Sequence, residues 1–244
     1  MRNIKLIVEY DGTAYHGWQS QDNATAVQDV VTEAVNRLTG EKCSIIGSSR
    51  TDTGVHALGQ VCNFFTNSKI PADKFAFALN TMLPDDIVIK HSEEVPADFH
   101  SRFSAKGKKY RYLIYNSTFP SALLRNRAYH VFYHLDCELM NKAAGHLTGT
   151  HDFIAFSAAG SSARTTTRTI TQANVSRNGE MIEITVAGDG FLYNMVRIIA
   201  GTLVEVGFGK IPPDAISEII AGRDRRKAGR TAPAHGLYLV EVYY

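Results

Sequence analysis

Three ionisable residues that could do chemistry together lie in one short stretch, RTDTGVH, at residues 50–56. Arg50 contributes a guanidinium, Asp52 a carboxylate and His56 an imidazole. A carboxylate beside a fixed guanidinium stays ionised and oriented, which a carboxylate nucleophile requires. Asp-Thr-Gly is also favourable turn chemistry, so Asp52 is either a nucleophile or a turn residue. His56 is either a catalytic group or a structural residue that holds the loop.

Two further residues with chemical potential lie in the second half of the chain. Arg197 interrupts FLYNMVRIIAGTLVEVG, a stretch that is apolar on most faces of a helix. A buried arginine is costly unless it is paired, and Asp52 is a candidate partner, although the arginine head could instead reach water. Tyr110 shares a strand face with Tyr112 in KKYRYLIY. Such a tyrosine either packs in the core, stacks on a base or takes part in proton transfer.

Other kinds of site find little support in the sequence. The histidines show no HExxH or clustered ligand spacing, GSSRT is not a GxSxG elbow, and GFGK at 207–210 lacks the phosphate-loop pattern. We therefore expect no metal and no cofactor. The three cysteines show no CxxC spacing, which favours a reducing, cytoplasmic compartment. No apolar run approaches the ~20 residues needed to span a bilayer, so no membrane association is expected.

The distribution of charge indicates a nucleic-acid partner, although the net charge is only +2. Residues 99–135 contain no Asp or Glu but carry seven Lys or Arg residues interleaved with Phe and Tyr. Residues 154–179 are also acid-free, and RDRRKAGR at 223–230 adds a third basic cluster. Cations that meet phosphates, mixed with rings that stack on bases, are typical of an RNA-binding surface. The alternative is that many of these rings belong to the core and the cations are merely solvated.

The hydrophobic pattern predicts the same unit twice. In the first half we expect strands at 3–10, 42–47, 59–66 and 86–91. A helix should begin at a capping box, Thr25 to Gln28, and end at Gly40, and a second should run over 72–83. This order is β-α-β-β-α-β, the split-βαβ or ferredoxin-like arrangement.

The second half repeats that order, with strands at 108–116, 168–177, 180–187 and 237–244. Helices are expected from Asp136 to about 147, over 191–206 and over 212–222. We predict an α+β fold of two tightly docked halves, 1–105 and 106–244, whose sheets join into one antiparallel-rich sheet with helices on one face. The second half closes its hairpin on Asn178-Gly179, a strong type I′ signal, whereas the first half inserts residues 48–58 there. The fold does not need this insertion, so we interpret it as an active-site loop.

Taken together, these residues resemble the tRNA pseudouridine synthase A (TruA) family and its pseudouridine synthase fold over essentially the whole chain. The matching stretches are VEYDGTAYHGWQSQ (8–21), AVQDVV (26–31), GSSRTDTGVHALGQV (47–61), LNTMLPDDI (79–87), DFHSRFSAKGKKYRYLIYN (98–116), GTHDFIAFSAAGSSARTTTR (149–168), FLYNMVRIIAGTLVEVG (191–207) and GLYLVEVYY (236–244). RTDxGVH followed by KxYRY is highly specific. Departures from the family pattern are small. Thr53 replaces a frequent Ala, and Asn194 stands where His is common. Ser48-Ser49 replace a pair before the RTDxGVH motif that is often Ala-Gly or otherwise contains Gly.

The resemblance implies a cofactor-free enzyme that isomerises uridine to pseudouridine in the anticodon stem-loop of tRNA, at tRNA positions 38, 39 and 40. It implies that Asp52 is the catalytic aspartate, that Tyr110 contacts the substrate base or acts as general base, and that Arg197 pairs with Asp52. It also implies a homodimer with one tRNA spanning both subunits. The substrate-binding residues implied are Arg50, His56, Tyr110 and Leu237. The residues implied to contact tRNA are Phe99, His100, Ser101, Arg102, Phe103, Gly160, Ser161, Ser162, Ala163 and Arg164.

This chemistry suits the residues, because a carboxylate can attack C1′ of the ribose, as in retaining glycosidases, or assist elimination to a glycal. Both routes stay open, and either needs a base for the C5 proton. Tyr110, with an ordinary pKa of about 10, would need help from a group such as Arg197. Two rival hypotheses are a non-catalytic RNA-binding protein and an Mg²⁺-dependent phosphotransferase with an aspartate nucleophile.

Overall fold

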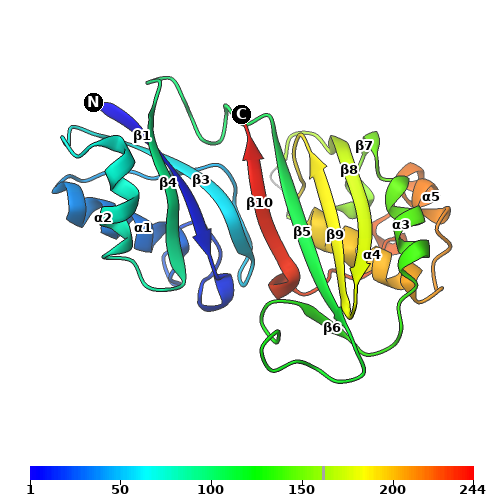
Figure 1. The fold of residues 1–244 in the computed structure, drawn as a ribbon. Coiled ribbons are helices and arrows are strands. Elements are labelled where there is room, and N and C mark those ends of the chain that lie inside the picture. Colours follow the sequence, from blue (N-terminus) through cyan, green and yellow to red (C-terminus); the bar gives the residue numbers. More distant parts are fainter. Residues whose placement is uncertain (161–162) are drawn as a thin grey trace. The chain divides into compact units, whose positions relative to one another are not determined.

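The computed structural model describes residues 1–160 and 163–244 and divides into two units (Figure 1). Unit 1 comprises Met1–Lys106 and Leu239–Tyr244, and unit 2 comprises Gly107–Tyr238. Strand β10 (Leu237–Tyr243) therefore begins in unit 2 and continues into unit 1. In the described part of the chain, no helix is long and apolar enough to cross a membrane.

Unit 1 contains the split-βαβ order that the sequence predicts. Its strands are β1 (Arg2–Tyr10), β2 (Ile46–Gly47), β3 (His56–Thr66) and β4 (Ile87–Val95). The strand order is β4-β1-β3, and the short β2 also pairs with β3. All these pairs are antiparallel. Strand β10 is another neighbour of β3. Helices α1 (Val27–Thr39) and α2 (Phe75–Asn80) pack against each other. The alternating apolar residues of β1 are buried, as a strand with one face on the core requires.

Unit 2 contains its own run of neighbouring, mostly antiparallel strands. Its order is β5 (Gly107–Asn116), β9 (Met181–Gly188), β8 (Thr167–Asn178) and β7 (Gly149–Asp152), with β6 (Tyr129–Val131) parallel to β5. Helix α3 (Cys137–Gly145) packs on β8 and on α4 (Met195–Gly207), while α4 also packs on β5. Helix α5 (Ala215–Gly222) completes the unit. The α+β class is confirmed, and β5, β8 and β9 repeat the relations of β1, β2 and β3.

Several predicted boundaries are wrong for identifiable reasons. Ala26, not Thr25, is the N-cap of α1, and the Asp29 carboxylate accepts a hydrogen bond from its amide (3.1 Å). The predicted strand 42–47 is paired only at Ile46–Gly47, and the predicted helix 72–83 is a 3₁₀ turn (Ala72–Lys74) followed by the short α2. Helix α4 starts at Met195 rather than 191, after a left-handed Asn194. Strands β6 and β7 were not predicted, because short strands carry too few residues to show a period.

The hairpin between β8 and β9 is also tighter than the type I′ prediction. Asn178 pairs with Met181, so the turn residues are Gly179 and Glu180. Gly179 has φ 60°, whereas Asn178 does not have a positive φ. Glycine with positive φ at the first turn position fits a type II′ turn. The comparison made from the sequence still holds: two residues connect β8 to β9, whereas residues 48–55 connect β2 to β3.

Candidate active site

The loop of residues 48–55 is held at its base by the strand that follows it. The Ser48 amide donates to the Val61 carbonyl (2.8 Å), and the Ser48 hydroxyl donates to Gln60 Oε1 (2.8 Å). Gln60 Nε2 donates in turn to the Ser49 carbonyl (2.8 Å). Ser48 and Gln60 are both buried, so these bonds satisfy polar groups that water does not reach. The loop therefore leaves the sheet in a defined direction.

The tip of the loop is held by the segment that follows β1. The Trp18 amide donates to the Thr51 carbonyl (3.3 Å), and the Gly54 amide donates to the Tyr15 carbonyl (3.3 Å). The Tyr10 and Thr51 hydroxyl groups are hydrogen-bonded at 2.8 Å. Asp52 thus lies between two residues whose positions are set by another segment of unit 1.

Glycine is required at the closest approach between this segment and the loop. Gly17 has φ +83°, and a Cβ there would lie 2.1 Å from the Thr51 carbonyl oxygen. A Cβ on Gly12 would lie 2.0 Å from the Val55 carbonyl oxygen. Both contacts are with backbone atoms, which cannot swing aside as a side chain can. These two glycines explain why DGTAYHG precedes the aspartate loop in the same unit.

Asp52 is the first residue of a turn that is formed by a backbone hydrogen bond. The Val55 amide donates to the Asp52 carbonyl (3.1 Å), and Gly54 has φ +77°, the pattern of a type II turn. The amides of Gly54 and Val55 therefore both donate to backbone carbonyls, whereas a turn residue of the Asx type would use its carboxylate. The Asp52 residue is half-buried, and its catalytic role stays a prediction.

His56 is a structural residue of this loop. Its side chain is buried, and its Nδ1 lies 3.0 Å from the Gly12 amide nitrogen and 3.1 Å from Asp11 Oδ1. Asp11 Oδ1 also accepts from the Thr13 amide (3.0 Å). The imidazole thus ties the start of β3 to the turn after β1. This geometry supports the structural alternative for His56.

Arg50 does not hold Asp52 as expected from the sequence. Its side chain is exposed, and among the residues that the structure describes it forms no ion pair with Asp52. The Thr51 carbonyl and hydroxyl, in contrast, are both hydrogen-bonded to residues 10–18. The loop is therefore oriented by backbone contacts rather than by a neighbouring guanidinium.

In unit 2, Tyr110 and Tyr112 share a face of β5 but differ in environment. Tyr110 pairs with Val186 of β9, and its ring packs edge-on against Phe191 at 5.0 Å between ring centroids. Tyr112 is fully buried, and its hydroxyl donates to the Pro233 carbonyl (2.8 Å). Burial raises the pKa of Tyr112 well above the ordinary value for tyrosine. Tyr112 is therefore a packing residue, and Tyr110 remains the candidate for substrate contact.

Arg197 lies in the first turn of α4 with its guanidinium fixed at two nitrogens. Nε donates to the Ala232 carbonyl (2.8 Å), and Nη1 donates to Asn194 Oδ1 (2.7 Å). The Ala232 amide donates back to the Arg197 carbonyl (3.0 Å). The side chain is half-buried and hydrogen-bonded to protein, rather than simply extended into water as the alternative interpretation required.

The segment that carries Ala232 is fastened to α4. A Cβ on Gly201 would lie 1.8 Å from the Arg230 carbonyl oxygen, and the Gly229 amide donates to Thr202 Oγ1 (2.9 Å). Pro233, the next residue after Ala232, accepts from Tyr112 on β5. One loop thus connects the strand of Tyr110 to the guanidinium of Arg197.

Arg225 and Arg226 of the basic cluster at 223–230 bond to backbone and acid groups beside this loop, and the cluster's role in RNA binding stays a prediction. Arg225 donates to the carbonyls of Ala228 and Gly229, and Arg226 pairs with Asp224 (2.9 Å). Arg223 pairs with Asp152 (3.0 Å), and Arg230 donates to the Tyr129 hydroxyl (2.7 Å). The sequence showed the charges but not the carbonyls and acids that engage them.

The residues implied to contact tRNA in unit 1 divide into exposed and structural ones. Phe103 is 77% exposed, with the Arg102 guanidinium carbon 5.7 Å from its ring centroid and the His100 ring at 4.3 Å. Ser101, by contrast, is fully buried and donates to Asn63 Oδ1, so its predicted tRNA contact is wrong for the side chain. Phe99 is half-buried against Tyr244 (4.9 Å).

In unit 2, the second predicted tRNA segment is only partly described. Gly160, Ala163 and Arg164 are exposed, whereas Ser161 and Ser162 lie outside the described residues. Leu237, predicted to bind substrate, is a buried residue at the start of β10.

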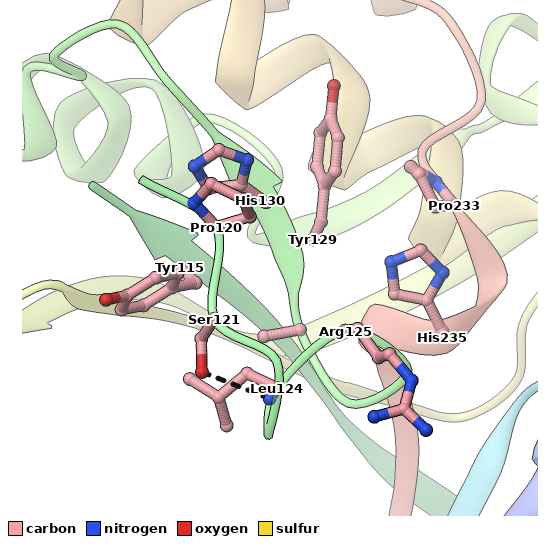
Figure 2. Close-up of a pocket in the computed structure, with 10 residues that line it drawn as sticks. Tyr115, Pro120, Ser121, Leu124, Arg125, Tyr129, His130, Pro233 and His235 are labelled. Atoms are coloured by element: carbon pink, nitrogen blue, oxygen red, sulfur yellow. Dashed lines mark hydrogen bonds between the residues drawn. The ribbon is translucent and has the colours of Figure 1, made fainter. Parts of the chain in front are cut away.

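A pocket of about 310 Å³ in unit 2 was not predicted (Figure 2). Aromatic and imidazole rings surround it, and no carboxylate is among its lining residues. The signal for it was present in the sequence as the acid-free, ring-rich stretch 99–135. The rings are Tyr115, Tyr129, His130 and His235, with Pro120, Leu124 and Arg125 between them. No group of three or more acidic, histidine or cysteine side chains in the described residues is arranged to hold a metal ion.

Comparisons with known proteins identify the family of this chain. A family model described as tRNA pseudouridine synthase matches residues 6–104 and 143–244. The chain is 66% identical over 244 residues to tRNA pseudouridine synthase A of Acetivibrio thermocellus, with both chains covered completely. It is 60% identical to the protein of the same name from Ruminiclostridium cellulolyticum and 51% identical to that from Clostridium acetobutylicum, again over the full length of each chain. The chain therefore belongs to the tRNA pseudouridine synthase family.

The close approach of Gly17 to Thr51 leads to a test of how the loop is held. Gly17→Ala should lower the free energy of unfolding by the cost of a left-handed alanine, about 1–2 kcal/mol, plus about 1–3 kcal/mol from the backbone clash. Gly40→Ala is the matched control, because Gly40 also has positive φ (71°) but nothing within 4 Å of its Cβ position. Chemical denaturation measures the free energy of unfolding of both variants. Equal losses of stability would contradict the conclusion that the contact between Gly17 and Thr51 holds the loop.

Proposed function

We propose that this protein isomerises uridine to pseudouridine in tRNA, with Asp52 as the catalytic carboxylate and without a cofactor. The observation that carries the proposal is the match to tRNA pseudouridine synthases along the whole chain, including the loop of residues 48–55. That loop is longer than the fold needs, and its tip is fixed by residues 10–18. A surplus loop that is nevertheless rigid is the kind of element that positions a catalytic group.

The reaction needs no group beyond carboxylate, acid and base. The bond between C1′ and N1 of uridine breaks, a bond between C1′ and C5 forms, C5 loses its proton and N1 gains one. The product is an isomer of the substrate, so no atom is gained or lost and nothing is oxidised or reduced. An Asp52 carboxylate can stabilise the sugar during the exchange either as a nucleophile at C1′ or by assisting elimination.

The other proposed roles rest on the resemblance to the family, supported for Arg50 and His56 by the placement of their side chains. Tyr110 contacts the substrate base and accepts the C5 proton, and Arg197 pairs with Asp52 and keeps it ionised. Arg50 is exposed and suited to a phosphate contact, whereas His56 acts by holding the loop. Leu237 contributes apolar contact near the substrate.

The proposed substrate surface uses the stacked group Arg102 and Phe103 in unit 1 and Gly160 to Arg164 in unit 2. A cation above an exposed ring can meet a phosphate while the ring stacks on an unpaired base. We propose that the target uridines are at positions 38, 39 and 40 of the anticodon stem-loop, and that the enzyme acts as a cytoplasmic homodimer of tightly docked halves. Extruding the target base costs a few kcal/mol, which such contacts can supply.

The activity is tested with tRNA that carries tritium at C5 of its uridines. Because C5 becomes bonded to C1′, each turnover should release one tritium to water. Release should be unaffected by an excess of metal chelator. Binding of tRNA without release would indicate an RNA-binding protein, and loss of release with chelator would indicate metal-dependent chemistry; either result contradicts the proposal.

The proposed pair of Asp52 and Arg197 is tested by a double-mutant cycle on the free energy of unfolding. Asp52→Asn and Arg197→Gln, alone and together, should show a coupling of about 0.5–3 kcal/mol, because residues in contact are not additive. The matched control is a second cycle that combines Asp52→Asn with Arg50→Gln, since Arg50 forms no ion pair with Asp52. Additive effects in the Arg197 cycle would contradict the pairing.

A further inference from the structure

Asn194 adopts an unusual conformation at the start of α4. It occupies the N-cap position with φ 59° and ψ 9°, in the left-handed region, and its side chain makes no cap hydrogen bond. In the described chain, Arg223 is the only other residue besides glycine with positive φ. An N-cap asparagine is normally extended, and its side-chain oxygen accepts from an amide of the first turn. Asn194 thus has neither the usual N-cap backbone conformation nor the usual capping hydrogen bond.

The side chain of Asn194 bonds instead to the side chain of the residue three positions later. Its Oδ1 accepts from Arg197 Nη1 (2.7 Å), while the Asn194 carbonyl accepts from the Ile198 amide (3.0 Å) and so begins the helix. With Nε of Arg197 bonded to the Ala232 carbonyl, the planar guanidinium is fixed by two acceptors at two different nitrogens. Two such bonds define the plane and direction of the group, which one bond could not do.

Both acceptors are themselves held in place. Ala232 is tied to the Arg197 backbone by its own amide (3.0 Å) and lies in the loop fastened to α4 through Thr202. Asn194 is fixed by its left-handed backbone at the helix start. Strained backbone persists where the surrounding structure determines it, and it is concentrated at functional sites.

We propose that Asn194 is a positioning residue, which fixes the direction of the Arg197 guanidinium. This inference rests on the proposed function for its catalytic consequence, but the orientation of Arg197 can be measured without activity. The Asn194 side chain speeds the chemical step and leaves tRNA affinity unchanged. A histidine at this position can also adopt positive φ and offers a ring nitrogen as acceptor.

The test separates the side chain of Asn194 from its backbone. Asn194→Gly keeps the left-handed conformation at no steric cost but removes the acceptor. Arg223→Gly is the control, because it makes the same backbone change at the end of α5, where φ is 53°. Asn194→His restores an acceptor. Each variant is measured for the single-turnover rate of tritium release, for tRNA binding, and for hydrogen exchange of the Arg197 Nη1–H protons by nitrogen-15 NMR.

We expect Asn194→Gly to slow the single-turnover rate by about 10–100-fold, the effect of losing one hydrogen bond to a charged group. Its tRNA dissociation constant should stay within about twofold of the wild-type value. The Arg197 Nη1–H protons should exchange at least about tenfold faster, because the bond to Asn194 is lost. Asn194→His should recover most of the rate, and Arg223→Gly should change none of the three quantities.

An unchanged rate in Asn194→Gly, or an equal loss in rate and affinity, would overturn the proposal. If the wild-type protein released no tritium, the proposed function would fail on its own. The exchange of the Arg197 Nη1–H protons would then still decide whether Asn194 orients the guanidinium, because unchanged exchange in Asn194→Gly contradicts that role.

Discussion

The close approach between Gly17 and Thr51 is the contact on which the aspartate loop depends. The Thr51 carbonyl occupies the place where any side chain at position 17 would lie, and it accepts a hydrogen bond from the Trp18 amide. Asp52 is the next residue, so its backbone position follows from this contact. The turn after β1 therefore does more than connect a strand to a helix: it forms the surface against which the loop is held. His56 fastens the same turn from the β3 side.

A comparable arrangement holds Arg197 in unit 2, although it is built from a different loop. There the segment 228–233 lies against α4, because glycine at 201 lets the Arg230 carbonyl approach the helix. The segment presents the Ala232 carbonyl to the guanidinium and the Pro233 carbonyl to Tyr112. Each unit thus uses a close backbone contact at glycine to place one ionisable side chain. In both cases backbone atoms contribute to placing the ionisable side chain.

The sequence predicted the class of fold and the strongest candidate residue, because both depend on local pattern. Apolar alternation and turn residues located most strands, and the repeated order showed that the loop holding Asp52 is longer than a hairpin needs. Ala26 as N-cap and the shortness of α2 could not be predicted, since they depend on contacts made elsewhere in unit 1. The same holds for the arginines at 223–230, whose carbonyl partners come from the folded loop itself. Ser101 was misassigned because its motif shows nothing of its bond to Asn63.

The central claim is that Asp52 acts on the substrate rather than on the turn that contains it. The most direct measurement is the amount of pseudouridine formed in tRNA by Asp52→Asn, quantified by nucleoside chromatography, together with its tRNA affinity and its free energy of unfolding. Because backbone carbonyls close the turn, the variant should fold and bind tRNA as the wild-type protein does yet form no pseudouridine. The exposed Asp22 provides the control, and Asp22→Asn should be fully active. Pseudouridine formation by Asp52→Asn, or loss of folding or tRNA binding in that variant alone, would contradict the claim.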